Sequence, residues 1–422
     1  RSLVLLSDPP DDTGPPHTLK LARTVETNTS EVLCLRYSED GRFLVACCGD
    51  GKIIVYNPGT GNTISILHSN VTRGASKQQE AEDSPETDEP KSLFPVVELP
   101  CTCADFRPDV GGAKTGNVLV AGYSTGAIKH WHVPSGKVCF SLKVWGAGFS
   151  GAPGLTYLDD EACLTATWGG QAGTGHSDFG VQVLCCAYAR DGKTFAAGAS
   201  DSLIRVYDDN TKGLVARLRP GVGLGANAGH SSRVFSVKFT PSDPNILVSA
   251  GWDRCVHIWD VKRESTIRSI FGPHVCGDSL DVVGNAILTG SWRSHTQVEL
   301  WDLNTGEPTK GIFWSAYVGS GGGSTTSCRL YAAAFSHAEG NEGRFIAAGG
   351  GDGSNEVKVY DLHNDYTLIG SLLGMSAGAI SLCFSPSGER LAVGLANGKI
   401  HYVDIGTVDN DTQTTSSKVI MV

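Results

Sequence analysis

The chain has 422 residues, enough for two or three average domains or for one large all-β domain. Its net charge of −10 argues against a general nucleic-acid binder, because phosphate contacts need a basic face. No apolar run approaches the roughly 20 residues that span a bilayer, so we expect no membrane insertion.

The chain contains 13 cysteines, an odd number, and most of them lie inside strand-like runs. Buried thiols behave as small hydrophobic side chains, and a domain of this size needs no disulfides to fold. This cysteine usage favours a reducing compartment, and we expect a cytoplasmic protein.

Short β-type runs separated by turn residues recur along the whole chain. An isolated strand-like run at residues 19–26 comes first. Seven groups of three runs follow, and these groups begin near residues 32, 101, 181, 234, 279, 330 and 380. Residues 69–95 and 145–177 interrupt the pattern, and we predict that they are insertions.

The spacing of the groups supports a repeat architecture. The residue that closes the third run of each group is aromatic in six cases out of seven: Tyr56, Trp131, Tyr207, Trp259, Trp301, Tyr360 and Val403. Successive gaps are 75, 76, 52, 42, 59 and 43 residues. The short gaps match the ~40–45 residues of one four-stranded propeller blade, and the long ones contain the insertions.

The stretch Gly229–Asp260 opens with a Gly-His pair, contains three strand-like runs and closes with a Trp-Asp pair. It resembles one WD40 repeat. The resemblance implies an all-β fold, a single seven-bladed WD40-type β-propeller at residues 17–407, with tails at 1–16 and 408–422. The seventh group lacks a fourth strand, and the isolated run 19–26 is predicted to supply it and so close the ring.

In the WD40 family, a complete blade holds a buried hydrogen-bond chain of His, Ser or Thr, Asp and Trp. The resemblance assigns this structural network to four residues: His230, Ser249, Asp253 and Trp259. The same His, Ser and Asp could instead form a catalytic triad. The Ser lies in the middle of a strand and lacks the G-x-S-x-G turn of a nucleophile elbow, so we expect no catalytic residues here.

Other residue patterns suggest ligand sites only weakly. The glycine-rich runs 169–175 and 221–229 lack the lysine of a phosphate-binding loop. Three pairs with metal-ligand side chains lack the C-x-x-C spacing of a structural zinc site: His130/His132, Cys101/Cys103 and His274/Cys276. We therefore expect no metal and no cofactor.

One rim of the ring is the best candidate for a binding site. In WD40 rings, the loop between the second and third strands and the loop before each blade open on the same face. Here these loops carry two tryptophan-arginine pairs and a histidine: Trp252, Arg254, His274, Trp292 and Arg293. Trp and Arg are common anchors of protein interfaces, so these residues are the predicted partner-binding site. Local packing of each Trp on the neighbouring loop is the alternative.

The family resemblance implies a non-catalytic scaffold or adaptor that docks proteins or peptides on one face of the propeller. Two alternatives stay open: an architectural subunit of a large assembly, and a propeller-based hydrolase or isomerase. A cluster of histidine and carboxylates at the central channel would favour the enzyme.

Overall fold

The computed structural model describes residues 17–68, 100–110, 115–144, 181–221, 228–314, 327–338, 340, 342–407 and 419–421. Both predicted insertions, residues 69–95 and 145–177, lie outside this part of the chain. The described elements are β-strands and one short 3-10 helix, Val133–Ser135. No helix in the described ranges has the length and apolar character needed to cross a membrane.

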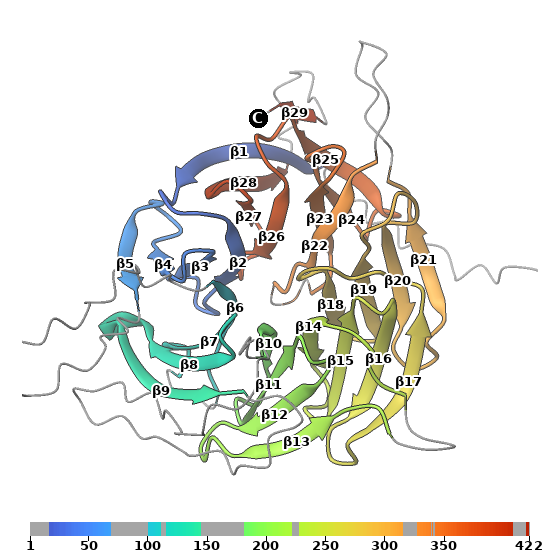
Figure 1. Ribbon diagram of the computed structural model, residues 1–422. Helices are drawn as coiled ribbons and strands as arrows, with labels where there is room; N and C mark the ends of the chain where they lie inside the picture. Colours follow the sequence, from blue (N-terminus) through green and yellow to red (C-terminus); the bar gives the residue numbers. More distant parts are fainter. Residues whose placement is uncertain are drawn as a thin grey trace, which may run out of the picture.

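Seven sheets stand around a central axis and form a closed ring (Figure 1). Blade 1 contains β2 (Val32–Tyr37), β3 (Leu44–Cys48), β4 (Ile53–Tyr56) and β5 (Thr63–Leu67). Blade 2 contains β6 (Cys101–Phe106), β7 (Val118–Tyr123), β8 (Ala127–His132) and β9 (Lys137–Lys143). Blade 3 contains β10 (Val183–Tyr188), β11 (Thr194–Ala199), β12 (Ile204–Asp208) and β13 (Leu214–Leu218).

Blade 4 contains β14 (Val234–Phe239), β15 (Ile246–Gly251), β16 (Cys255–Asp260) and β17 (Ser265–Phe271). Blade 5 contains β18 (Leu280–Val283), β19 (Ala286–Gly290), β20 (Val298–Asp302) and β21 (Pro308–Ile312). Blade 6 contains β22 (Arg329–Phe335), β23 (Phe345–Gly351), β24 (Val357–Asp361), β25 (Thr367–Leu373) and β29 (Val419–Met421). Blade 7 contains β26 (Ala379–Phe384), β27 (Arg390–Leu395), β28 (Lys399–Thr407) and β1 (His17–Glu26).

The predicted fold and its closure are confirmed. β1 runs antiparallel along the outer edge of β28, with pairs from His17↔Thr407 to Glu26↔Lys399 and a bulge between Leu21 and Arg23. One blade therefore contains strands from both ends of the propeller sequence (Figure 1). This pairing covers the edge that β28 would otherwise expose.

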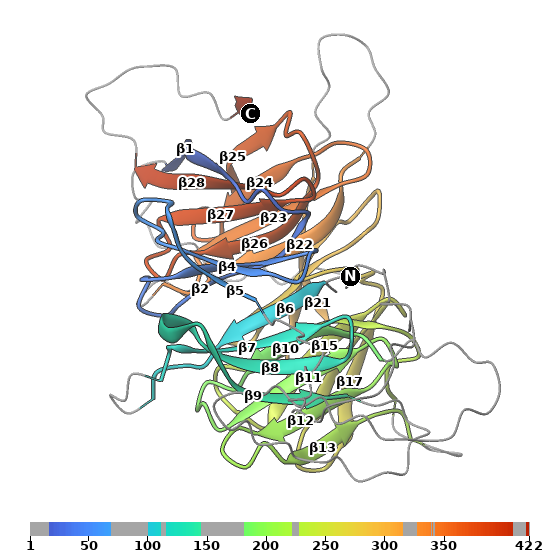
Figure 2. The same cartoon turned by 60° about the vertical axis from the view of Figure 1, so that its left-hand side comes forward.

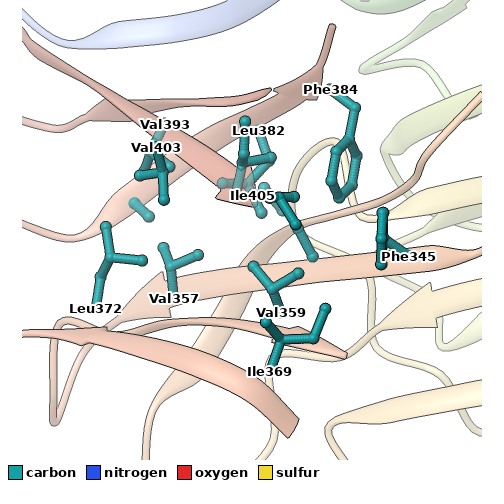
Figure 3. Packing of buried hydrophobic residues seen from close by; sticks show 14 of the residues in the cluster. Phe345, Val357, Val359, Ile369, Leu372, Leu382, Phe384, Val393, Val403 and Ile405 are labelled. Carbon is teal, nitrogen blue, oxygen red and sulfur yellow. The ribbon is translucent and has the colours of Figure 1, made fainter. Parts of the chain in front are cut away.

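The hydrophobic core lies between the blades, because each sheet buries both faces against its neighbours. All seven residues that close the third strands are buried, from Trp259 and Val403 at 0% exposure to Trp301 at 8%. Between blades 6 and 7, Phe345, Val357 and Leu372 pack against side chains of β26, β27 and β28 (Figure 3). The aromatic periodicity of the sequence thus marks positions where a large side chain fills the space between two sheets.

The structure differs from the sequence prediction at the C-terminal end. We predicted a tail from residue 408 onward, but Val419–Met421 forms β29, a fifth strand in blade 6. It pairs in parallel with β25, with Ser371↔Val419, Leu372↔Ile420 and Leu373↔Met421 in register. Three residues carry too little pattern to be recognised as a strand, and their partner lies 48 residues away in the chain.

Candidate functional site

Blade 4 contains a continuous chain of buried polar contacts. His230 Nδ1 lies 2.9 Å from Asp253 Oδ2, and its Nε2 lies 2.8 Å from Ser249 Oγ. The indole N–H of Trp259 donates to the same Ser249 hydroxyl at 2.8 Å. Asp253 also accepts from the backbone N–H groups of Ser231 and Cys255. The network thus fixes the turn between β15 and β16, which carries part of the predicted rim.

Replacing His230 with alanine should lower the free energy of unfolding by about 1–3 kcal/mol, because Ser249 and Asp253 lose a buried hydrogen-bond partner. Urea denaturation followed by tryptophan fluorescence measures the change. His295→Ala is the control, because His295 is exposed and its hydrogen-bond partner among the described residues is the neighbouring Ser294. Equal stabilities for the two variants would mean that the network contributes nothing.

In two other blades, the indole N–H of the tryptophan that corresponds to Trp259 has a different hydrogen-bond acceptor. Trp301 Nε1 donates to Thr289 Oγ1 at 3.0 Å in blade 5, and Trp131 Nε1 donates to the Tyr123 hydroxyl at 3.2 Å in blade 2. Both tryptophans are buried, so each N–H needs an acceptor. A hydroxyl facing the indole is therefore a recurring solution among the described blades.

A second histidine lies against the blade 4 network. The His257 ring is 4.5 Å from that of His230, and ligand atoms of His230, Asp253 and His257 lie within 4.8 Å of one another. Burial, then the neighbouring His230, lowers the pKa of His257 to about 4, so His257 is neutral at physiological pH. These are metal-ligand groups, but both His230 nitrogens already face Asp253 and Ser249. The absence of a metal stays a prediction.

The predicted rim residues Trp252, His274 and Trp292 form one aromatic cluster. The Trp252 ring centroid lies 4.5 Å from that of His274 and 5.9 Å from that of Trp292, and the His274 and Trp292 rings meet edge-on at 5.9 Å. The ring centroid of Phe235, the second residue of β14, lies 6.1 Å from that of Trp252. A backbone bond from Trp292 N to His274 O, 2.8 Å long, joins the two loops.

The cluster combines exposure with unsatisfied polar atoms. Trp252 is 44% exposed, an unusual state for a tryptophan. His274 is 9% exposed, and its Nε2 has no hydrogen-bond partner among the described residues; the same holds for Trp292 Nε1. Burial, then Arg254 and Arg293, lowers the pKa of His274, so the ring is neutral at pH 7. The rim thus offers an exposed apolar face at Trp252, while the two unpartnered ring nitrogens are buried in the cluster.

The arginines of the rim lie in three different arrangements. Arg293 does not stack on a tryptophan: its guanidinium contacts Glu299 and the Thr296 and Gly272 carbonyls, and so holds the loops of blades 4 and 5 together. The cation over Trp292 is Arg329, at 4.5 Å, which the sequence analysis missed. Arg329 is the first residue of β22 and directly follows the loop before blade 6. Because loops of this type open on the rim, this position is the sequence signal that could have identified it.

Arg254 occupies a strained backbone position. It adopts φ +60°, and the corresponding turn of blade 3 has Ser202 at φ +63°, whereas the turns of blades 1, 2 and 7 have Gly51, Gly126 and Gly398 at φ +86°, +81° and +80°. The left-handed region disfavours side chains, so glycine is the residue that fits this turn without strain. Blade 4 has an exposed arginine there instead. Residues held in such conformations cluster at functional sites.

Two exposed phenylalanines flank the cluster at the same end of the blades. Phe271, 76% exposed, pairs with Cys255, which directly follows the turn of Trp252 and Arg254. Phe313 is 85% exposed and follows the last residue of β21. Single exposed apolar side chains are common at protein surfaces, so these two phenylalanines do not by themselves define a binding surface.

The central channel contains a second polar cluster. The fifth residue of an innermost strand is half-buried and charged in blades 1, 2 and 4: Arg36, Asp105 and Lys238. Arg36 Nη2 donates to Asp278 Oδ2 at 2.5 Å, and Lys238 Nζ lies 3.5 Å from Asp278 Oδ1. Blades 1 and 5 are not neighbours, so the Arg36–Asp278 contact spans the channel. Asp281 Oδ2 lies 2.9 Å from His337 Nε2.

The channel acids differ in their pKa. Burial would raise the pKa of Asp278, but the charges of Arg36 and Lys238 outweigh it and hold the pKa below its usual value. Asp281 behaves likewise beside His337, whose own pKa is raised by that carboxylate. For Asp105, the effect of burial exceeds that of Arg36, so the pKa is raised. Arg36 lies 3.9 Å from Asp105 and also bonds Asp278.

The remaining candidate pairs have structural contacts. His132 Nδ1 bonds Ser135 Oγ at 2.7 Å, while His130 packs edge-on against Phe140 and Phe195. Cys101 and Cys103 are both buried, and all 12 described cysteines are free. The glycine run 169–175 lies outside the described residues, and 221–229 lies partly outside them.

Comparison with known proteins supports the repeat assignment. The WD domain, G-beta repeat (WD40) profile matches residues 19–57, 169–208 and 224–260. The first match starts in β1 and ends after β4, so one sequence repeat is shared between blades 7 and 1. The chain thus contains WD40 repeat matches in three places, and its described sheets, six with four strands and one with five, form a seven-bladed β-propeller.

The chain is also similar, over about half of its length, to several known proteins. It is 24% identical over 213 residues to the transcriptional corepressor LEUNIG_HOMOLOG of Arabidopsis thaliana, covering 50% of this chain and 23% of the relative. It is 28% identical over 222 residues to the U3 small nucleolar RNA-associated protein 15 homolog of Xenopus laevis, covering 52% and 37%. For the ribosome biogenesis protein WDR12 homolog of Nematostella vectensis, the identity is 22% over 230 residues, covering 49% and 51%. The matches thus span only about a quarter to a half of these relatives.

Proposed function

We propose that this chain is a non-catalytic scaffold that binds a protein or peptide at the rim of blades 4 to 6. The observation that carries the proposal is the aromatic cluster of Trp252, His274 and Trp292, in which the Trp252 ring leaves an apolar face exposed. A bound chain would cover the exposed face of Trp252. Trp and Arg dominate the energetics of such interfaces.

The arginines support a protein ligand over a small apolar one. Arg254 is exposed at the same end of the blades, and Arg329 stacks on Trp292 while bonding Asp352 at 2.8 Å. Backbone carbonyls and carboxylates of a peptide fit this mixture of stacked rings and guanidinium groups. The strained position of Arg254 further supports a role that compensates for its conformational cost.

Substituting Trp252 and Trp292 with alanine should abolish recovery of the partner, because both interface anchors are removed. Affinity purification with mass spectrometry from cells, with wild type and the double variant in parallel, should show specific partners lost from the variant. With the purified partner, each single substitution should weaken binding at least about tenfold.

The matched control is Ile66→Ala, which removes an exposed apolar side chain from the outer strand of blade 1. Thermal melting of each variant checks that the fold is intact. Unchanged partner recovery by a folded Trp252→Ala/Trp292→Ala variant would contradict the proposal.

Membership in a large assembly is the second candidate, and the printed names of the relatives favour it. One relative is a corepressor, one is small nucleolar RNA-associated and one is a ribosome biogenesis protein. We propose that this chain likewise acts within a multiprotein complex, through protein contacts and not by binding nucleic acid. Cross-linking of the endogenous complex separates a peripheral adaptor, with contacts at the rim, from an architectural subunit with contacts around the ring.

We propose no enzymatic role for the channel cluster, although histidine and carboxylates in this place are the feature that would favour an enzyme. Each of its three carboxylates lies within 4 Å of a basic side chain: Asp105 and Asp278 near Arg36, and Asp281 near His337. This charge balance supports a structural role across the ring. Hydrolase activity that disappears on His337→Ala without loss of stability would contradict it.

We also propose a reducing compartment, the cytoplasm, because eight of the 12 described cysteines are buried as free thiols. Fluorescence microscopy of the tagged chain tests this proposal. A purely nucleolar signal, in line with the name of one relative, would move the site of action to the nucleus.

A further inference from the structure

The outer edge of blade 6 differs from those of the other blades. Five of the seven residues of β25 are buried, whereas the outer strands of the other six blades have at most two buried residues each. Ile369 and Leu372 point into the core shared with blade 7 (Figure 3). The sequence of β25, TLIGSLL, contains no charged residue.

Uncharged edges are exceptional in this ring. Outer strands usually avoid pairing with other chains by carrying charges or proline. β1, β9, β13, β17 and β21 each carry Lys or Arg, and β21 begins with Pro308. β5 also lacks charge, but four of its five residues are not buried. Among the described sheets, β25 is therefore the outer strand best suited to accept a further strand.

The structure contains such an added strand. β29 pairs in parallel with Ser371–Leu373 and also contacts β1, whereas the other strand pairs of the blades are antiparallel neighbours. Both views place the C-terminal end beside β25 (Figures 1 and 2). The pairing covers three of the seven residues of β25, so Thr367–Gly370 has no fifth-strand partner among the described residues.

We propose that the outer edge of blade 6 is a strand-addition site for an extended aliphatic segment of a partner protein. Val419–Met421 is then the chain's own competing occupant. A partner strand of seven residues could pair along the whole of β25, so it would replace the three-residue strand β29. Main-chain hydrogen bonds give such sites affinity, and the alternating side chains give selectivity. The strand that pairs with this edge in the structure, Val419–Met421, has an aliphatic sequence.

The test uses a fluorescein-labelled peptide with the sequence of residues 415–422, TSSKVIMV, and fluorescence anisotropy. A chain truncated after Thr407 should bind the peptide at least tenfold more tightly than the intact chain, because β29 no longer competes. A peptide carrying Ile420→Pro should bind at least tenfold more weakly, because proline lacks the backbone N–H. A third peptide carries Ser416→Val and Lys418→Val and is therefore aliphatic along more of its length. It should bind even the intact chain, because it would displace β29 from the edge of β25.

The intact chain carrying Ile420→Pro is a second open-edge variant and covers the case in which truncation prevents folding. It should also bind the TSSKVIMV peptide more tightly than wild type. The Trp252→Ala/Trp292→Ala variant should bind the peptides like wild type, which separates this site from the rim. Equal binding of the TSSKVIMV and proline peptides to both open-edge variants would overturn the proposal. Dimerisation of the intact chain without binding of added peptide would assign the edge to strand exchange between two copies, and would also overturn it.

Discussion

Deletion of residues 17–26 should destabilise the entire propeller and lower the free energy of unfolding by about 4 kcal/mol or more, a size that few single changes reach. β1 supplies the outer strand of blade 7 and pairs with β28 along almost its full length. Its removal would expose the edge of β28 and uncover the core to which Leu19 and Leu21 contribute. Because the ring closes only in this blade, we expect one cooperative transition at a lower melting temperature.

Point variants of the intact chain test whether the side-chain packing of β1, and not merely the shortening of the chain, accounts for the loss of stability. Leu19→Ser/Leu21→Ser should lower the melting temperature of the intact chain, whereas Lys20→Ser should leave it nearly unchanged, because Lys20 is exposed. Differential scanning calorimetry measures all three proteins. A deletion variant that melts at the wild-type temperature would show that β1 does not close the ring.

Removal of the Asp278 carboxylate should cost about 3 kcal/mol, because it leaves the partly buried cations Arg36 and Lys238 without their shared counter-ion. Replacing both partners, in Arg36→Met/Asp278→Leu, should cost less than Asp278→Ala alone, because no charge is stranded. Glu342→Ala is the control: its side chain is 40% exposed and its ion pair with Arg190 lies at the surface, so the expected change is within about 0.5 kcal/mol. Equal losses for Asp278→Ala and Glu342→Ala would contradict a stabilising role of the Arg36–Asp278 contact across the channel.

The same network predicts a pH dependence. Because the folded-state pKa of Asp278 is lowered, its contribution is complete above the unfolded value of about 3.9 and is lost as the pH falls through the folded-state pKa. His337 has the opposite sign: its raised pKa makes its contribution complete below about 6.5 and lost at higher pH. Urea denaturation between pH 2 and 5 should therefore show a shallower loss for Asp278→Asn than for wild type. Parallel curves would contradict this assignment.

Much of the fold could be predicted from the sequence, because a propeller repeats one pattern of strands, turns and closing aromatic residues. The blade 4 network was predictable for the same reason: His230, Ser249, Asp253 and Trp259 stand at fixed positions of a repeat. The parallel pairing of β29 with β25 was not predictable. It joins two distant segments through main-chain bonds, which leave little trace in the side-chain pattern.

The candidate site was predictable only in part. The loops of Trp252, His274 and Trp292 could be placed on one face, because alternating strands bring their turns to the same end. Which arginine stacks on Trp292 depends on side-chain geometry, and Arg329 from the next blade takes that place. The channel pairs Arg36–Asp278 and Asp281–His337 depend on contacts across and around the ring, which local sequence does not encode.

The most direct test of the docking rim is site-specific photo-cross-linking in cells. A photoreactive phenylalanine analogue placed at position 252 should form a covalent adduct with a protein partner, and the same analogue at position 66 on β5 should not. Trp292→Ala in the same chain should abolish the adduct from position 252. No adduct at position 252, or equal adducts at positions 252 and 66, would contradict a docking surface at the rim of blades 4 to 6.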